Sequence, residues 1–260
     1  MDLGTIIGFI VCFGGFIGGF LLEGGQLSSL VQITAAAIVF GGCTGAAIIG
    51  APFADTLNSF KIFMKAFMRP SYDMGPIIGK FVGYAEKVRR EGLLVLEEDA
   101  SQETDAFLRN GLQLVIDGND TDLVKDILAT ELRYVEMRHH RGAAYFENLG
   151  GFGPTFGIIG TVMGLINVLA NLGGDVAALG QAVAVAFVAT LYGVVSANAV
   201  FLPIANKLKF ASSEEALMRE IMIEGILSIQ AGDNPRIVQE KLSAFLPPSM
   251  RGGIAEATEE

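Results

Sequence analysis

Four long stretches of the chain contain no Asp, Glu, Lys, Arg or His, and they constrain the fold more than any other feature. They cover residues 3–22, 24–54, 148–174 and 176–206. A helix that crosses a bilayer needs roughly 20 mostly apolar residues, so each stretch can supply one span. A soluble helical core would instead need a solvent-facing polar stripe on its helices, and uncharged runs of this length do not provide one. The sequence therefore predicts an all-α, polytopic membrane protein with four transmembrane helices.

The charged residues separate two membrane hairpins from two polar segments. We predict a first hairpin over residues 1–54, with spans near 3–22 and 29–50, and a second over 148–206, with spans near 152–172 and 179–203. Between the hairpins lies a helical domain, residues 55–147, and a tail of residues 207–260 follows them. Neither hairpin connector is long enough to hold a domain, so nearly all of the polar mass is predicted on one side of the membrane.

The distribution of positive charge predicts which side that is. All 18 Lys and Arg residues lie in the two polar segments, 12 in the first and 6 in the tail. By the positive-inside rule, the large loop, the tail and both termini are cytoplasmic. The net charge of −10 argues against a nucleic-acid partner, because phosphate binding needs basic patches. The partners left open are membrane lipid around the spans and other proteins.

The polar segments show the spacing of amphipathic helices. Apolar residues recur at helical spacing over residues 107–116, 124–135 and 218–226. Asp117-Gly118-Asn119 is expected to end the first of these helices, and the second helix is expected to continue into the third span. Asn234-Pro235 is expected to end the helix of the tail.

Glycine recurs at four-residue spacing within the spans, which lets helices approach closely. This spacing fits packing within one bundle and association between subunits equally well. The pairs are Gly4/Gly8, Gly14/Gly18, Gly15/Gly19, Gly41/Gly45, Gly153/Gly157 and Gly160/Gly164.

The spans lack the buried carboxylate that ion pumps and transporters usually keep at membrane depth. Neutral polar residues remain, among them Thr161 in the third span and Thr190 in the fourth. A threonine in a span often bonds only to the carbonyl four residues earlier. If the protein moves ions, the acid must come from another chain.

Three segments carry a resemblance to a known family. Residues 150–165 read GGFGPTFGIIGTVMGL, residues 184–193 read AVAFVATLYG and residues 201–208 read FLPIANKL. A charged segment, residues 89–98, reads RREGLLVLEE. Together with the span order and loop sizes, these segments resemble the MotA family, the stator subunits of the bacterial flagellar motor.

The resemblance implies an assembly in the bacterial cytoplasmic membrane. A ring of MotA-like subunits, five in number, would surround MotB-like single-span helices that carry the ion-binding aspartate. Inward flow of sodium ions or protons would turn the ring, whose cytoplasmic charges push the rotor protein FliG. No cofactor, resident metal or enzymatic activity is implied.

The resemblance also assigns roles to residues. Arg89, Arg90, Glu97 and Glu98 match the segment that faces the rotor. If all four lie on one helix, the basic and acidic pairs stand slightly more than two turns apart on one face. Without the resemblance, a solvated and salt-bridged face would be the simpler interpretation.

Two prolines and two threonines complete the expected site. Pro154 and Pro203 match paired family prolines, expected to couple the ion path to the loop, although a proline can also merely start or end a helix. Thr161 occupies a position where sodium-coupled members carry Thr, and hydroxyl oxygens suit a hard cation. Thr161 and Thr190 are thus expected in the ion pathway. We favour sodium, although Ala189 departs from a double Thr of some sodium forms.

Other function classes fit less well. An ExbB-like or TolQ-like energiser of an outer-membrane system is the closest alternative, but those proteins typically have three spans. A stand-alone solute transporter would be expected to show a substrate-binding charge or matched broken helices. For a membrane enzyme, His139 and His140 point to different faces of one helix, and no nucleotide-binding loop is present.

Overall fold

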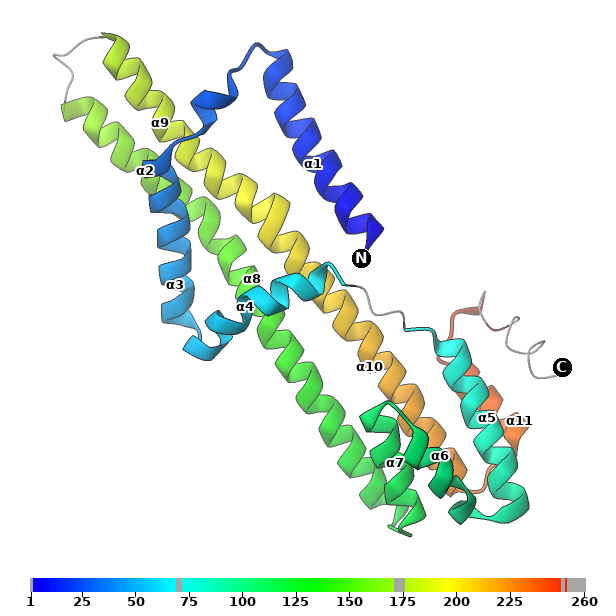
Figure 1. Ribbon diagram of the computed structural model, residues 1–260. Helices are drawn as coiled ribbons and strands as arrows, with labels where there is room; N and C mark the ends of the chain where they lie inside the picture. Colours follow the sequence, from blue (N-terminus) through cyan, green and yellow to red (C-terminus); the bar gives the residue numbers. More distant parts are fainter. Residues whose placement is uncertain (1, 69–71, 171–175, 249–250, 252–260) are drawn as a thin grey trace. The chain divides into compact units, whose positions relative to one another are not determined.

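The computed structural model describes residues 2–68, 72–170, 176–248 and 251 (Figure 1). All regular secondary structure in these ranges is helical. The α-helices are α1 (Leu3–Leu22), α2 (Ile33–Ala36), α3 (Gly42–Gly50), α4 (Phe53–Ala66), α5 (Met74–Glu91), α6 (Leu96–Gln102), α7 (Ala106–Ile116), α8 (Thr121–Ala170), α9 (Val176–Val195), α10 (Leu202–Gln230) and α11 (Pro235–Ser243). Short 3-10 helices are η1 (Leu27–Leu30) and η3 (Leu93–Val95), and π-helices are η2 (Ala37–Gly41) and η4 (Ser196–Phe201).

Four helical stretches are long and apolar enough to cross a bilayer, namely Leu3–Leu22, Leu27–Gly50, Thr121–Ala170 and Leu179–Gln230. The second runs through η1, α2, η2 and α3, and the fourth runs through α9, η4 and α10. The predicted all-α fold with four spanning helices is confirmed. The expected continuation of the 124–135 helix into the third span is also confirmed, because α8 covers both. The predicted end of that span, residue 172, lies outside the described residues.

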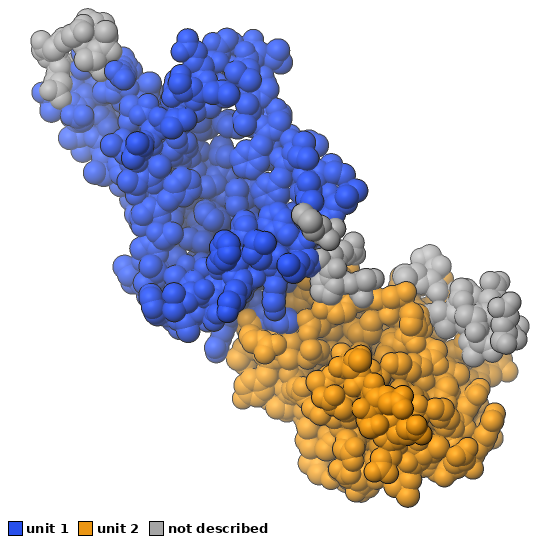
Figure 2. Space-filling model, in the orientation of Figure 1, with its two compact units in different colours: residues 1–69, 139–210 blue, residues 70–138, 211–260 orange. Residues whose placement is uncertain are grey.

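The chain forms two compact units, which Figure 2 colours separately. Unit 1 contains residues 1–69 and 139–210, and unit 2 contains residues 70–138 and 211–260. Residues 55–68, 139–147 and 207–210 therefore pack with the spans, although we assigned them to polar segments. Compactness does not locate the membrane surface, so the predicted boundaries at residues 54, 147 and 206 stay predictions.

The core of unit 1 joins the second span to the later ones. Val39 and Cys43, in the second span, are almost fully buried and belong to one apolar cluster with Phe146 of α8, Ala189 of α9 and Ile204 of α10. The free thiol of Cys43 thus packs as a small apolar group.

Helix α1 is attached to unit 1 mainly at its first turn. None of its residues is buried. Asp2 caps the helix by accepting from the Gly4 amide at 3.2 Å, and its own amide donates to the Phe67 carbonyl at 3.1 Å. The Asp2 carboxylate also pairs with Lys207 of α10, whose ammonium group contacts Thr5. The start of the first span is therefore fixed by charge, by hydrogen bonds and by the stacking of Phe9 on Phe67, whose ring centroids lie 5.7 Å apart, and not by a fully buried side chain.

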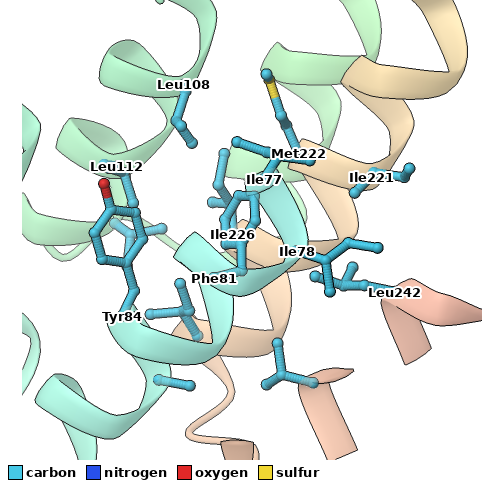
Figure 3. Close-up of a cluster of buried hydrophobic side chains, with 14 of the residues drawn as sticks. Ile77, Ile78, Phe81, Tyr84, Leu108, Leu112, Ile221, Met222, Ile226 and Leu242 are labelled. Atoms are coloured by element: carbon cyan, nitrogen blue, oxygen red, sulfur yellow. The ribbon is translucent and has the colours of Figure 1, made fainter. Parts of the chain in front are cut away.

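The core of unit 2 is built from the amphipathic stripes that the sequence predicts. Figure 3 shows Phe81 of α5 among side chains of α7, α10 and α11. Leu108 and Leu112 of the first stripe, Leu128 of the second and Ile226 of the third are each at most 1% exposed. The expected break after α7 is confirmed as well, because Gly118 adopts φ +74° between α7 and α8.

The end of the tail helix differs from expectation. Helix α10 ends at Gln230, before Asn234-Pro235, because Gly232 with φ +72° already reverses the chain there. Asn234 instead caps α11, its side chain accepting from the Arg236 amide at 3.1 Å, and Pro235 occupies the first turn. The dipeptide thus starts a new helix rather than ending the previous one.

Candidate functional site

Within unit 1, α8 and α9 meet along a row of small residues. A methyl group placed on Gly193 of α9 would lie 2.2 Å from the Gly153 carbonyl oxygen of α8. A methyl group on Gly160 or Gly164 would lie 2.6 Å from the β-carbon of an alanine in α9. Such distances are too short for any side chain, so the glycines allow backbone-to-backbone contact here. We call this interface the α8–α9 seam.

The seam separates the two interpretations of the glycine pairs. Gly153/Gly157 and Gly160/Gly164 pack within this chain, as the bundle interpretation expects. Apart from the nearby backbone of the same helix, no described atom lies within 4 Å of a methyl group placed on Gly8, Gly14, Gly15, Gly18 or Gly19 of α1, or on Gly41 and Gly45 of the second span. On those glycines the bundle interpretation finds no support within the described chain.

Thr161 and Thr190 face each other across the seam. Their hydroxyl oxygens are in direct hydrogen-bond contact. Thr161 Oγ1 also lies 3.1 Å from the Gly157 carbonyl oxygen and 2.9 Å from that of Ala186, and Thr190 Oγ1 lies 3.5 Å from the Gly157 oxygen. Four oxygen atoms from two helices thus converge at one place. Thr161 does bond to the carbonyl four residues earlier, but that bond is one of several.

The two hydroxyls bring one proton each to the four oxygens, and each carbonyl also accepts from the amide four residues later in its own helix, which leaves lone pairs unused. The two hydroxyls can therefore satisfy only part of the acceptor capacity of the cluster. The side chains of Thr161 and Thr190 are half-buried, and the stretches around them, residues 148–170 and 176–206, contain no charged residue. Such a group of neutral oxygens can offer ligands to a cation that sheds its water.

Other polar residues of the fourth span are used differently. Tyr192 fixes the start of the second span, because its hydroxyl donates to the Leu30 carbonyl and accepts from the Gln32 amide at 3.1 Å. Ser196 and Asn198 bond within their own helical stretch, to the carbonyls of Gly193 and Val194. Of these polar side chains of the described chain, the structure brings Thr190 together with Thr161 in an oxygen cluster, while Tyr192, Ser196 and Asn198 bond elsewhere.

Pro154 lies in the interior of α8 and Pro203 is the second residue of α10, directly after the π-helix η4. The interpretation that they merely start and end helices is wrong, because helical structure continues on both sides of each. The segments around them also touch. A methyl group on Gly150, four residues before Pro154, would lie 2.5 Å from Leu202, the neighbour of Pro203.

The charged segment is not one helix. Helix α5 ends at Glu91, and Gly92 with φ +86° turns the chain through η3 into α6. The expectation that Arg89, Arg90, Glu97 and Glu98 share one helix face is therefore wrong. The signal was present in the sequence, because basic residues in a last turn with a glycine just beyond it, here Arg89-Arg90-Glu91-Gly92, are a typical helix end.

The four charges instead occupy the helix ends that favour them. Arg89 and Arg90 lie in the last turn of α5, and Glu97 and Glu98 lie in the first turn of α6. All four side chains are exposed, and none of them forms an ion pair with another described residue. We call this group of four the tip charges.

Two family models match the chain. Residues 6–91 match the model described as motility protein A N-terminal, and residues 99–221 match that of the MotA/TolQ/ExbB proton channel family. Motility protein A of Bacillus subtilis (strain 168) is 36% identical over 260 residues, which cover 100% of this chain and 96% of that protein. The chain belongs to the MotA family. Chemotaxis protein PomA of Vibrio alginolyticus, another relative of this MotA-family chain, is 36% identical over 251 residues, 96% of this chain and 98% of that one.

A solved structure agrees with the family assignment. The chain superposes on the flagellar MotAB stator complex from Bacillus subtilis with a TM-score of 0.91 and 36% identity, covering 98% of this chain and 100% of that chain. The resemblance found in the sequence is thus confirmed, and this MotA-family chain is an inner-membrane protein. These flagellar relatives favour the flagellar interpretation over an ExbB-like or TolQ-like energiser. The roles of the individual site residues stay predictions.

Proposed function

We propose that this chain is a flagellar motor stator subunit that, with a MotB-like partner, couples inward ion flow across the cell membrane to torque on the rotor. The single observation that carries this proposal is the match over nearly the whole length of a MotAB stator structure, in a chain whose spans hold no acid of their own. A carboxylate at membrane depth is the usual ion-exchange group. A partner helix that carries an aspartate supplies the missing group, so the two chains form the site together.

The assembly we propose is a ring, of five copies, around the partner helices. The loop, the tail and both termini are cytoplasmic, in agreement with the one-sided Lys and Arg distribution. The tip charges of each copy meet the rotor protein FliG. Their exposure and their lack of ion pairs with other described residues leave them available for a charged surface outside the chain.

We propose sodium as the coupling ion. The observation that favours it is the oxygen cluster of Thr161, Thr190 and the Gly157 and Ala186 carbonyls, since a sodium ion passing a neutral wall needs oxygen ligands and a proton does not. Pro154 and Pro203 lie where the α8 and η4–α10 segments touch, which supports a role in passing movement between the ion path and the loop.

The test uses a stator-deleted motile bacterium that expresses the chain with its MotB-like partner. Swimming speed is measured against sodium concentration at fixed pH, with and without a protonophore. We expect speed to rise with sodium and to survive the protonophore, and Thr161→Val to reduce the speed strongly. Thr155→Ala is the matched control, because Thr155 also lies in α8 and bonds only to the Phe152 carbonyl at 2.7 Å.

Several outcomes would contradict parts of the proposal. Rotation that needs no sodium would refute the sodium assignment but not the stator function. Full swimming of both Pro154→Ala and Pro203→Ala would refute the coupling role of the prolines. An active channel that purifies without any single-span partner would overturn the proposed mechanism, and so would cells that insert both chains and never rotate.

A further inference from the structure

Within unit 2, two ion pairs join the two arms of the α5–α6 hairpin, and both lie farther from the turn than the tip charges do. Lys80 Nζ of α5 lies 2.7 Å from Glu103 Oε2, just after α6. Nearer the turn, Lys87 Nζ of α5 lies 2.7 Å from Asp99 Oδ2 of α6. Both pairs have the base on α5 and the acid on the returning arm. We call these two pairs the clamp.

Glu103 is the anchor of the clamp and is a costly residue to bury. It is the one charged residue that is buried within the described part of the chain, with 5% of its side chain exposed. Besides Lys80, its carboxylate accepts from the amides of Thr104 at 2.9 Å and Asp105 at 3.2 Å. A carboxylate loses its hydration here, so it is tolerated only because these donors replace the water.

The same carboxylate fixes the direction of the chain between α6 and α7. Glu103 follows the last residue of α6, and Asp105 caps α7 by accepting from the amides of Phe107 and Leu108 at 2.8 and 3.0 Å. Glu103 and Asp105 thus hold the backbone between α6 and α7 by accepting from its amides, and the ion pair with Lys80 ties this segment to α5. Burial and the nearby charges of Glu103 and Asp99 raise the pKa of Tyr84 to about 12, which keeps its hydroxyl neutral beside the clamp.

The tip charges repeat the arrangement of the clamp but are not paired. Arg89 and Arg90 end the α5 arm, and Glu97 and Glu98 begin the α6 arm, yet no ion pair joins them to each other or to other described residues. Glu103 and Asp99 are already paired with Lys80 and Lys87, so they do not draw the side chains of Arg89 and Arg90 toward the hairpin. The hairpin thus separates charges that hold its arms from charges that face outward.

We propose that Lys80, Glu103, Lys87 and Asp99 are positioning residues that set the spacing and direction of the tip charges toward the rotor. This inference rests on the proposed function, in which the tip charges meet the rotor. A surface ion pair in general adds little to stability. The geometry points to a different use, because both pairs join the same two arms and end where the outward-facing charges begin.

The test compares single reversals with the swapped pair. Asp99→Lys and Lys87→Asp each place like charges opposite one another, and the double variant K87D/D99K restores an opposite pair. The matched control is Asp233→Asn, which breaks a pair of similar length and exposure, Lys241 with Asp233 at 2.8 Å, outside the hairpin. For the buried pair, the double variant Lys80→Met with Glu103→Gln removes both charges and keeps a side-chain oxygen that can accept from the amides of Thr104 and Asp105.

Two readouts are taken on each variant. Hydrogen exchange of residues 93–105 is measured by mass spectrometry on the purified complex with its partner chain. Torque per stator unit is measured as the size of single speed steps of a bead on a rotating motor. We expect each reversal to speed exchange about threefold or more and to reduce the speed steps. The reason is that two like charges in contact destabilise the hairpin by about as much as two opposite charges stabilise it. The swapped pair restores both, and Asp233→Asn changes neither.

The outcomes separate the clamp from the stator function. Unchanged exchange in both reversals would overturn the clamp itself. Faster exchange with full-size speed steps would overturn its positioning role. A wild-type complex that never drives rotation would overturn the proposed function and the rotor role with it, while the exchange data would still decide whether the clamp holds the hairpin.

Discussion

The α8–α9 seam gives the sharpest test of the structure. Replacing Gly193 by Ala places a methyl group 2.2 Å from the Gly153 carbonyl oxygen and 3.0 Å from the Gly157 Cα, whereas ordinary contact begins at 3.4 Å. The deficit exceeds 1 Å, and the obstructing atoms belong to the backbone, so no side chain can rotate away. The two helices must separate locally, which also pulls Thr190 away from Thr161.

Overpacking of this kind costs about 1–3 kcal/mol, and a backbone obstruction should fall at the upper end. For a chain of this size, 3 kcal/mol corresponds to a fall in melting temperature of about 6–12 °C. The assay is thermal unfolding of the purified complex, monitored by the far-ultraviolet circular dichroism signal of its helices. Gly151→Ala is the control, since no described atom outside the nearby backbone of α8 lies within 4 Å of a methyl group there, and better helix propensity should make it neutral or slightly stabilising.

The result that would refute this reasoning is an unchanged melting temperature for Gly193→Ala. An equal loss for Gly151→Ala would also refute it, because the effect would then follow from changing any glycine of these helices rather than from the seam. Motility provides a second measure. We expect Gly193→Ala to stop swimming and Gly151→Ala to preserve it, as the threonine cluster needs the close approach.

Three further predictions concern the ends of helices and the buried carboxylate. Asp2→Ala removes the cap of α1 and the partner of Lys207, so it should cost about 1 kcal/mol and speed amide exchange of residues 3–6, and Asp2→Asn, which keeps a capping oxygen, should cost less. Gly92→Ala forces a side chain into φ +86°, which should cost about 1–3 kcal/mol and speed exchange over η3. Burial would raise the pKa of Glu103, but hydrogen bonds from Lys80 and from the amides of Asp105 and Thr104 outweigh it and lower the pKa below 4.5. Its stabilising contribution is therefore complete above pH 4.5 and is lost as pH falls through the folded-state value, and acid unfolding curves of Glu103→Gln should lack that loss.

The span count and the helix stripes could be predicted because both depend on contrast between apolar and charged residues. Leu108, Leu128 and Ile226 are buried where the spacing indicates, since polar neighbours mark the opposite face of each helix. The clamp could not be found in this way. Lys80 and Glu103 are 23 residues apart in sequence and lie in different elements, so only the turn at Gly92 brings them together.

The threonine cluster was only half predictable. Sequence alone identifies Thr161 and Thr190 as hydroxyl groups in spans, but any threonine there can satisfy itself on its own helix. Their contact depends on the register between α8 and α9, which is set by where glycine and alanine allow the backbones to meet. Because the glycines and alanines on either side of the two threonines are all small and apolar, the sequence offers several registers of similar quality.

The helix through Pro203 shows the limit of periodicity in an uncharged stretch. A proline inside an α-helix removes one hydrogen bond and clashes with the carbonyl four residues earlier, so Pro203 was compatible with a helix end. The helical structure continues because η4 changes the ladder first, with the Leu202 amide donating to the Ala197 carbonyl five residues before it. No residue type marks such a wide turn, and in an apolar stretch a period of 3.6 and a wider one look alike. The turn adds a residue to the helix next to the proline, and π-turns of this kind are frequent at functional sites. The π-helix thus ends two residues before Pro203 and lies against the row that holds Thr161 and Thr190, where a change of register would move the proline and the threonines at once.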